Sequence, residues 1–267
     1  MSTSVNGNIR IVFIGAGNVA THLAQAFDKA EGIEVVQVYS RTVESATSLS
    51  DKLNRSVATD KVSEIISDAD VYIVSMVDDA VASVVEKLPK GDALWLHTSG
   101  SLPKEILAPL SRSYGVFYPL QTFSKDIDVD VSIVPIFIEG SDPEVGERIE
   151  RLARGISYKV FYADGELRRK MHIAAVFACN FTNHLWTIAD DLLKREGLGL
   201  EVLHPLLSET LRKAMASSPA AGQTGPAKRG DRGVMDKHIS MLPDGLDAIY
   251  RLLSSEIYKY HHSNEQN

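Results

Sequence analysis

The sequence is short of the features that mark secreted, membrane-bound and nucleic-acid-binding proteins. Its single cysteine, Cys179, cannot form an intrachain disulfide. No uncharged apolar run approaches the roughly 20 residues that cross a bilayer, and the polar residues 1–8 lack the basic and apolar regions of a signal peptide. A net charge of -7 leaves no excess of cations for a nucleic-acid backbone. We therefore expect a cytoplasmic protein with no membrane or nucleic-acid partner.

Two kinds of catalytic centre are also missing from the sequence. No cluster of His, Cys, Asp and Glu has the spacing of a metal site. The Gly-x-Ser-x-Gly elbow of hydrolases does not occur. The sequence therefore predicts no metal centre of this kind and no nucleophile elbow.

In the first half of the chain, strand-like and helix-like patterns alternate, as in an α/β protein. A β-branched apolar run at 9–14 stops at a glycine and is followed by a helical pattern. Strands alternating with helices indicate a parallel sheet with right-handed crossovers, so we predict a doubly wound Rossmann domain over residues 1–163. The further strands are expected at 34–39, 71–76, 93–97, 116–118, 135–139 and 158–162, with helices at 43–53 and 143–154.

The strand signal disappears from Asp164 onward. One long helical stripe then extends to Leu192, and further helices are expected at 201–216, 235–242 and 246–261. A segment rich in Gly, Pro and charge separates them at 217–233. We predict a smaller, all-helical second domain over residues 164–267.

The turn after the first strand has the pattern of a dinucleotide-binding site. Gly15 permits the tight turn, Gly17 lets the backbone approach a pyrophosphate, and Ala20 lets the helix pack closely on the strand. The opening of a helix at this point favours phosphate. The predicted cofactor contacts here are Gly15, Ala16, Gly17, Asn18, Val19 and Ala20.

The end of the second strand indicates which dinucleotide binds. NAD-binding domains place Asp or Glu there to bind the ribose hydroxyls, but this chain has Ser40, Arg41 and Thr42. An arginine flanked by hydroxyls binds a 2′-phosphate, which a carboxylate would repel. We therefore predict NADP (NADPH) over NAD, although Thr42 could equally cap the following helix.

Two later strands end at the same carboxyl edge of the predicted sheet, where open α/β folds bind ligands. We expect Met76 and Val77 to cover the nicotinamide or its ribose. Thr98 and Ser99 supply hydroxyl and backbone donors beside it. His97, which immediately precedes them, is a candidate proton donor or a structural histidine.

The long helix carries an uncharged polar stripe that includes His172, Asn180 and Asn183. Polar residues at helical spacing are most often the solvated face of a helix. Such faces usually carry Lys and Glu, however, and the absence of both here indicates a buried interdomain cleft as the alternative. We predict His172 and Asn180 as catalytic candidates and Asn183 as a substrate contact. Further substrate contacts are predicted in two loops, at Gln121, Thr122, Lys228 and Arg229.

Several segments together carry a resemblance to a known family. The segments are GAGNVA, SRT, HTSGSLP, YPLQTF, MHIAAVFACNFTNHLWTIADDL and TGPAKRGD. The sequence resembles the bacterial Rossmann-like proteins that have a C-terminal helical domain of unknown function and are described as NADP oxidoreductases. The resemblance covers nearly the whole chain.

The resemblance implies kinship with pyrroline-5-carboxylate reductases and β-hydroxyacid dehydrogenases, whose helical domain dimerises. It therefore implies a homodimer formed through the helical domain. β-Hydroxyacid dehydrogenases place a catalytic Lys four residues before an Asn, whereas here Lys170 is followed at that spacing by Ala174, and Val176 stands four residues before Asn180. His172 and Asn180 are the nearest polar substitutes.

The leading hypothesis is an NADP-dependent oxidoreductase that transfers a hydride between NADPH and a small carbonyl or imine substrate. His172 or His97 would donate the proton, and Lys228 or Arg229 would bind an anionic group of the substrate. The alternatives are a non-catalytic NADP-binding redox sensor and a deazaflavin-linked NADP oxidoreductase.

Overall fold

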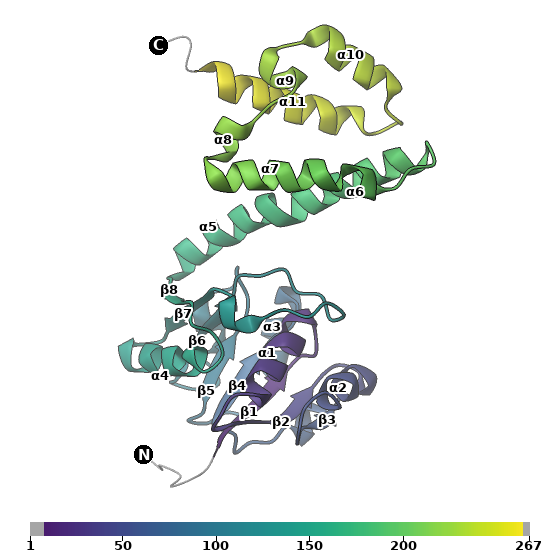
Figure 1. Ribbon diagram of the computed structural model, residues 1–267. Helices are drawn as coiled ribbons and strands as arrows, with labels where there is room; N and C mark the ends of the chain where they lie inside the picture. The colour runs from purple at the N-terminus through teal and green to yellow at the C-terminus, as the bar shows by residue number, and fades with distance from the viewer. Residues whose placement is uncertain (1–7, 264–267) are drawn as a thin grey trace. The chain divides into compact units, whose positions relative to one another are not determined.

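The computed structural model describes residues 8–263 and contains one eight-stranded sheet (Figure 1). The strand order is β3-β2-β1-β4-β5-β6-β7-β8. The central strand β1 is almost fully apolar, and Ile11, Val12, Phe13 and Ile14 have no exposed surface. The strands are β1 (Ile9–Ile14), β2 (Ile33–Tyr39), β3 (Val57–Thr59), β4 (Val71–Val74), β5 (Leu94–His97), β6 (Tyr114–Pro119), β7 (Ile136–Gly140) and β8 (Val160–Tyr162).

The sheet reverses its strand order at β1, which lies between β2 and β4. All three strands are parallel, so their carboxyl ends meet at one edge and leave a crevice there. The predicted doubly wound α/β domain is therefore confirmed, and the crevice lies where α1 (Asn18–Asp28) begins.

One strand pair departs from the predicted parallel arrangement, because β7 pairs with β6 antiparallel. The connection between these strands contains only a loop and a short 3-10 turn at Val131–Ile133, with no crossover helix to carry the chain back to the opposite edge. β7 and β8 are connected by a helix and are parallel. β3, a strand of only three residues, was not predicted from the sequence.

Apolar side chains pack on both faces of the sheet. One core joins the sheet to α1, α2 (Val43–Ser50) and α4 (Pro143–Arg154). The other joins it to α3 (Asp78–Val85) and the 3-10 helix Lys104–Leu107. Because both faces are covered, the central strands are apolar throughout.

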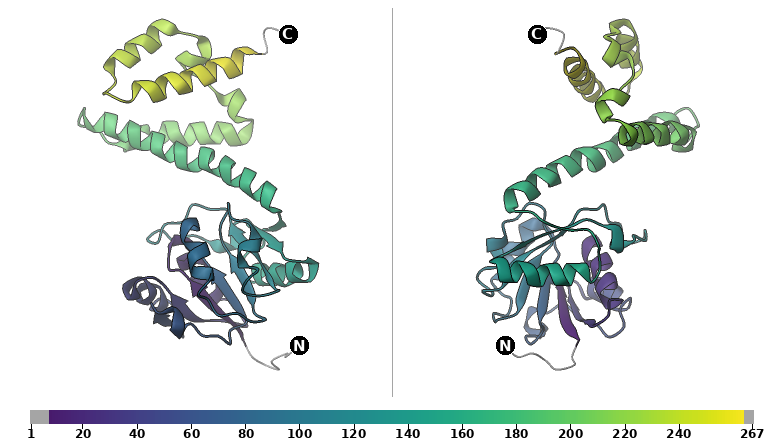
Figure 2. Two further views of the ribbon diagram at one scale, coloured as in Figure 1. Left: turned by 180° about the vertical axis from the view of Figure 1, so that it is seen from behind. Right: turned by 60° about the vertical axis from the view of Figure 1, so that its left-hand side comes forward.

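The chain after β8 is helical, as predicted, but its long helix is not continuous α-helix. A π-helical segment, Val176–Phe181, lies between α5 (Gly165–Ala175) and α6 (Thr182–Lys194). Its wider turns break the α-helical periodicity that was used to align His172 with Asn180 and Asn183. The remaining helices are α7 (His204–Ala216), α8 (Pro219–Gly222), α9 (Pro226–Arg229), α10 (Arg232–Met241) and α11 (Asp247–His262) (Figure 2).

The chain divides into two compact units, residues 1–184 and 185–267. The strands end where the sequence placed the boundary, near Asp164, but α5 belongs to the first unit. The reason is that Arg168 on α5 is fully buried and bonded to the sheet unit. Within residues 8–263, no helix combines the length and the hydrophobicity that a membrane span requires.

Candidate functional site

The turn between β1 and α1 has the backbone shape of a phosphate site. Gly15 has φ +118°, and a Cβ there would lie 2.1 Å from the carbonyl oxygen of Ser75, so only glycine fits. Gly17 is the N-cap of α1, and no side chain caps the helix. The first turn of α1 also contains no acidic residue. Its backbone N–H groups are thus available to an anion.

Arg41 lies in a pocket beside this turn. The pocket has a volume of about 250 Å³. Arg41 is exposed and makes no ion pair or hydrogen bond with residues 8–263. The pocket is lined by Gly15, Ala16, Gly17, Ser40, Arg41, Ser45, Ser75, Met76, Val77, Ala80 and Lys125.

Thr42 caps a helix, which is the second of the two roles considered for it. Its hydroxyl accepts a hydrogen bond from the backbone N–H of Ser45 at 3.4 Å and caps α2. Thr42 does not line the pocket, whereas Ser45 does. Sequence reasoning missed Ser45 because it lies inside the helix rather than at the strand end.

A second pocket of about 370 Å³ adjoins the first and shares Gly17, Ser75, Met76 and Val77 with it. It extends along the carboxyl edge to the ends of β5 and β6. The predicted residues that it brings together beyond the shared ones are Asn18, Val19, Thr98, Ser99, Gln121 and His172. Among the described residues, the linings of the two pockets are therefore continuous from Arg41 to His172.

His172 and Tyr118 form a hydrogen-bonded pair in the second pocket. The Oη atom of Tyr118 lies 2.9 Å from Nδ1 of His172, and both residues line the pocket. Gly100 allows this approach, because a Cβ there would lie 2.8 Å from the same Nδ1 atom and 3.0 Å from Cζ of Tyr118. His172 was predicted as a catalytic candidate from the sequence, whereas Tyr118 was not among the predicted site residues.

Burial raises the pKa of the Tyr118 phenol, and the positive charge of Arg168 partly opposes this effect. The phenol therefore keeps its proton throughout the neutral range. A protonated phenol that faces a pocket and contacts an imidazole can donate a proton to a ligand and recover one from the imidazole. The pair is thus suited to proton transfer.

The other candidate histidine, His97, is in a different environment. It is 1% exposed, and its Nδ1 accepts a hydrogen bond from the backbone N–H of Ser99 at 3.2 Å. Burial, followed by the charge of Arg168, lowers the pKa of His97 to about 3. His97 is therefore neutral at physiological pH, and it lines neither pocket. Its buried Nε2 has no hydrogen-bond partner among the described residues, and the role of His97 stays a prediction.

A buried ionic cluster holds α5 against the sheet. Arg168 donates to Glu139 Oε2 at 2.6 Å and to the carbonyl oxygen of Leu102 at 2.7 Å. Lys104 contacts the other carboxylate oxygen of Glu139 at 3.2 Å. Because His172 lies one helical turn after Arg168, the cluster also positions His172 against Tyr118.

Other predicted site residues lie outside these two linings. Asn180 is exposed within the π-helical segment, and Ala20 is fully buried behind the glycine turn, where it packs as expected. Lys228 belongs to the second unit, where its Nζ donates to the carbonyl oxygen of Gln223 at 2.9 Å. The roles proposed for Asn180, Asn183, Thr122, Lys228 and Arg229 toward substrate stay predictions.

Comparisons with known proteins identify the family of this chain. Residues 10–95 match the model described as "NADP oxidoreductase coenzyme F420-dependent", and residues 134–257 match a domain of unknown function, DUF2520. A crystal structure described as a "putative NADP oxidoreductase" from Bacteroides fragilis is 43% identical, covers 94% of this chain and 98% of its own, and has a TM-score of 0.90. The chain belongs to this NADP oxidoreductase family. The family resemblance seen in the sequence is thereby confirmed.

More distant structures share the fold of this NADP oxidoreductase family. An imine reductase from Pseudomonas sp. is 18% identical, with 97% of this chain and 94% of that chain covered and a TM-score of 0.62. A reductive aminase from Aspergillus terreus, solved with NADPH and ethyl-5-oxohexanoate, is 17% identical, with 97% and 88% covered and a TM-score of 0.59. No curated protein matches the chain. Family membership supports an oxidoreductase role with a nicotinamide cofactor.

Proposed function

We propose that the chain is an NADP-dependent reductase that transfers a hydride from NADPH to a small carbonyl or imine. The observation that carries this proposal is the continuous lining from the glycine turn and Arg41 to the Tyr118–His172 pair. The residues present fit a dinucleotide, because the start of α1 has no side-chain cap and its N-cap residue Gly17 lines both pockets. The names of the imine reductase and reductive aminase that share the fold agree with this class of acceptor.

NADP is favoured over NAD by the charges in the first pocket. Among the described residues, Arg41 and Lys125 are its only charged lining residues, so no carboxylate of the described lining opposes a 2′-phosphate. Ser40 and Ser45 offer hydroxyl groups beside Arg41. A phosphate bound by an arginine fork and hydroxyl donors gains charge-assisted hydrogen bonds that NAD cannot form.

The protein's own residues supply the acid for the reaction. When bound, NADPH would supply the hydride for the acceptor carbon. The Tyr118 phenol donates its proton to the acceptor oxygen or nitrogen. The imidazolium form of His172 then returns a proton to the phenolate through the 2.9 Å contact and takes up a new proton from solvent. Thr98 and Ser99 line the same pocket and help to orient the acceptor.

The decisive test is oxidation of NADPH by purified protein in the presence of a panel of 2-ketoacids, ketones, cyclic imines and a deazaflavin. We expect acceptor-dependent oxidation by a carbonyl or imine, and faster reaction with NADPH than with NADH because of Arg41. Turnover of the deazaflavin alone would favour the alternative that the description of the 10–95 match suggests. Tight NADPH binding without turnover of any acceptor would contradict the proposal and favour the redox sensor.

We also propose that the helical unit associates with a second copy of the chain. Among the described residues 185–263, only Ala227 is buried. Large apolar side chains are open to solvent, for example Leu206 at 62%, Met215 at 79% and Met241 at 81% exposure. A large exposed apolar surface marks a site of association. The commonest oligomer of soluble proteins is a dimer in which two copies meet through the same surface.

Sedimentation equilibrium at micromolar protein concentration tests this association. We expect a mass twice that of a single chain, and we expect Leu211→Glu to shift the mass toward the monomer because a charge would enter the apolar face of α7. Leu211 is 57% exposed in the single chain, so the substitution leaves the fold of the monomer largely unaffected. A monomeric wild-type protein at these concentrations would contradict the proposal.

A further inference from the structure

A loop distant from the nucleotide fingerprint brings a second cation to the first pocket. Lys125 follows the end of β6 and lines the same pocket as Arg41, which follows β2. Lys125 is exposed and makes no ion pair or hydrogen bond with residues 8–263. The chain carries a net charge of -7, yet within residues 8–263 the lining of this pocket has two unpaired cations and no carboxylate.

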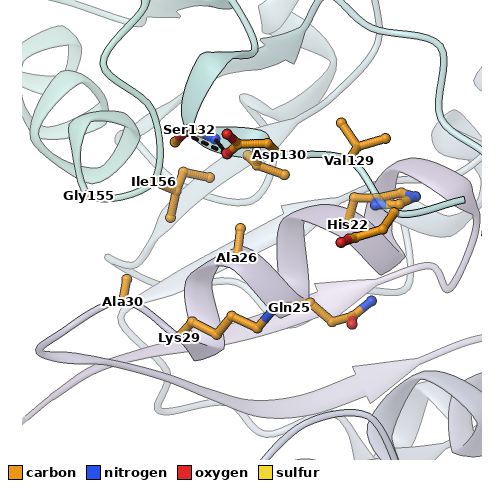
Figure 3. A pocket seen from close by; sticks show the side chains of 12 residues that line it. His22, Gln25, Ala26, Lys29, Ala30, Val129, Asp130, Ser132, Gly155 and Ile156 are labelled. Atoms are coloured by element: carbon orange, nitrogen blue, oxygen red, sulfur yellow. Dashed lines mark hydrogen bonds between the residues drawn. The ribbon is translucent and has the colours of Figure 1, made fainter.

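The residues before Lys125 are fixed to α1. His22 on α1 is 6% exposed, and its Nε2 donates to the carbonyl oxygen of Ser124 at 2.9 Å. The imidazole ring also stacks on Phe123, with ring centroids 4.9 Å apart. Figure 3 shows His22 extending from α1 toward the segment that carries Val129. Lys125 therefore follows a residue whose backbone is tied to the helix that begins at the glycine turn.

The chemistry of the pocket is that of a phosphate site. Backbone N–H groups at the start of α1 carry only partial charges, whereas a lysine supplies a full positive charge that reaches phosphate as a point contact. An exposed, unpaired lysine beside a glycine turn also attracts an anion without first breaking an ion pair. Both features favour a ligand with several phosphate groups.

We propose that Lys125 binds a phosphate group of the dinucleotide in the pocket that it shares with Arg41. This inference rests on the proposed function, because it requires that a dinucleotide occupies the pocket. The phosphate can belong to the pyrophosphate, which NADH and NADPH share, or to the 2′-phosphate, which only NADPH has. Lys125 is thus a cofactor-binding residue supplied by the loop that also carries Gln121, a residue of the second pocket.

The test is fluorescence titration of the full chain with NADPH and with NADH. We expect Lys125→Ala to weaken NADPH binding by about 10-fold to 100-fold, which corresponds to the loss of one hydrogen bond between charged groups. Lys125→Arg should retain most of the affinity because it keeps the charge. Lys87→Ala is the matched control, since Lys87 is also exposed and lies beyond the far end of α3.

Comparing the affinities for NADH and NADPH shows which of the two phosphates Lys125 binds. An equal loss for NADH and NADPH assigns Lys125 to the pyrophosphate, and a loss confined to NADPH, as expected for Arg41→Ala, assigns it to the 2′-phosphate. In either case the affinity of Lys125→Ala should depend less steeply on salt, because one charge contact is gone. A merely structural effect of the loop would leave the salt dependence unchanged and would overturn the inference.

The two proposals fail in different ways. Unchanged affinities of Lys125→Ala for both dinucleotides, in a protein whose wild type binds them, would overturn the role of Lys125 alone. A wild-type protein that binds neither dinucleotide would overturn the proposed function and this inference with it.

Discussion

Tyr118→Phe and His172→Gln should each lower kcat for ketone reduction by about 100-fold to 10,000-fold, the usual contribution of a positioned general acid. Both substitutions remove one end of the 2.9 Å contact between the phenol and the imidazole. The affinity for NADPH should change little, because neither residue lines the pocket of Arg41. Steady-state and single-turnover oxidation of NADPH measure the effect.

Two comparisons separate a proton-transfer role from a general loss of structure. Because the two residues act as a unit, the double variant should be no slower than the slower single variant. An iminium acceptor already carries its proton, so the loss should be much smaller for it than for a ketone. Tyr162→Phe is the matched control, since the Tyr162 hydroxyl contacts only Glu150 in the described structure and lies outside both pockets. Wild-type kcat in both single variants would show that the proton comes from another source.

The second large effect is expected from Arg168→Met. The Arg168 side chain is 1% exposed and bonded to Glu139, which is 18% exposed. Removing one partner of a buried ion pair leaves the other uncompensated and typically costs about 3–5 kcal/mol. Because Lys104 still contacts Glu139 at 3.2 Å, we expect the lower end of this range, about 3 kcal/mol.

Urea denaturation followed by tryptophan fluorescence measures the loss. The background should be Trp186→Phe, so that the signal comes only from Trp95, which is 1% exposed in the sheet unit. Arg168→Met combined with Glu139→Gln should recover part of the stability, because no uncompensated carboxylate then remains. The control Arg154→Met removes an exposed pair with Glu150 and should cost much less stability than Arg168→Met. An equal loss in Arg168→Met and in the control would contradict the structural role of the cluster.

Sequence reasoning succeeded where neighbouring residues decide the outcome. The strand, turn and helix around Gly15 were predictable because the turn needs a glycine at positive φ directly after an apolar strand. The helix at 143–154 was predicted with the observed bounds, since Asp142 caps it and Pro143 starts it. Arg41 lies in the pocket for the same local reason, because it follows the end of β2.

The same reasoning was less successful where two local explanations competed. Thr42 was expected as a phosphate contact or a helix cap, and the structure shows the cap. His97 was considered as an acid or a structural residue, and only its burial and the nearby charge of Arg168 indicate that it is neutral. The polar stripe of the long helix was aligned with α-helical geometry that the π-helical segment does not follow.

The sequence by itself determined the Rossmann order of elements, the glycine turn and the cation after β2, because each depends on residues that are adjacent in the chain. Only the tertiary structure decided that Tyr118 meets His172, that Arg168 holds α5 to Glu139, and that Lys125 shares a pocket with Arg41. Such contacts join segments that are far apart in the chain. They depend on how strands pair and how loops are anchored, and side-chain packing across the whole sheet sets both.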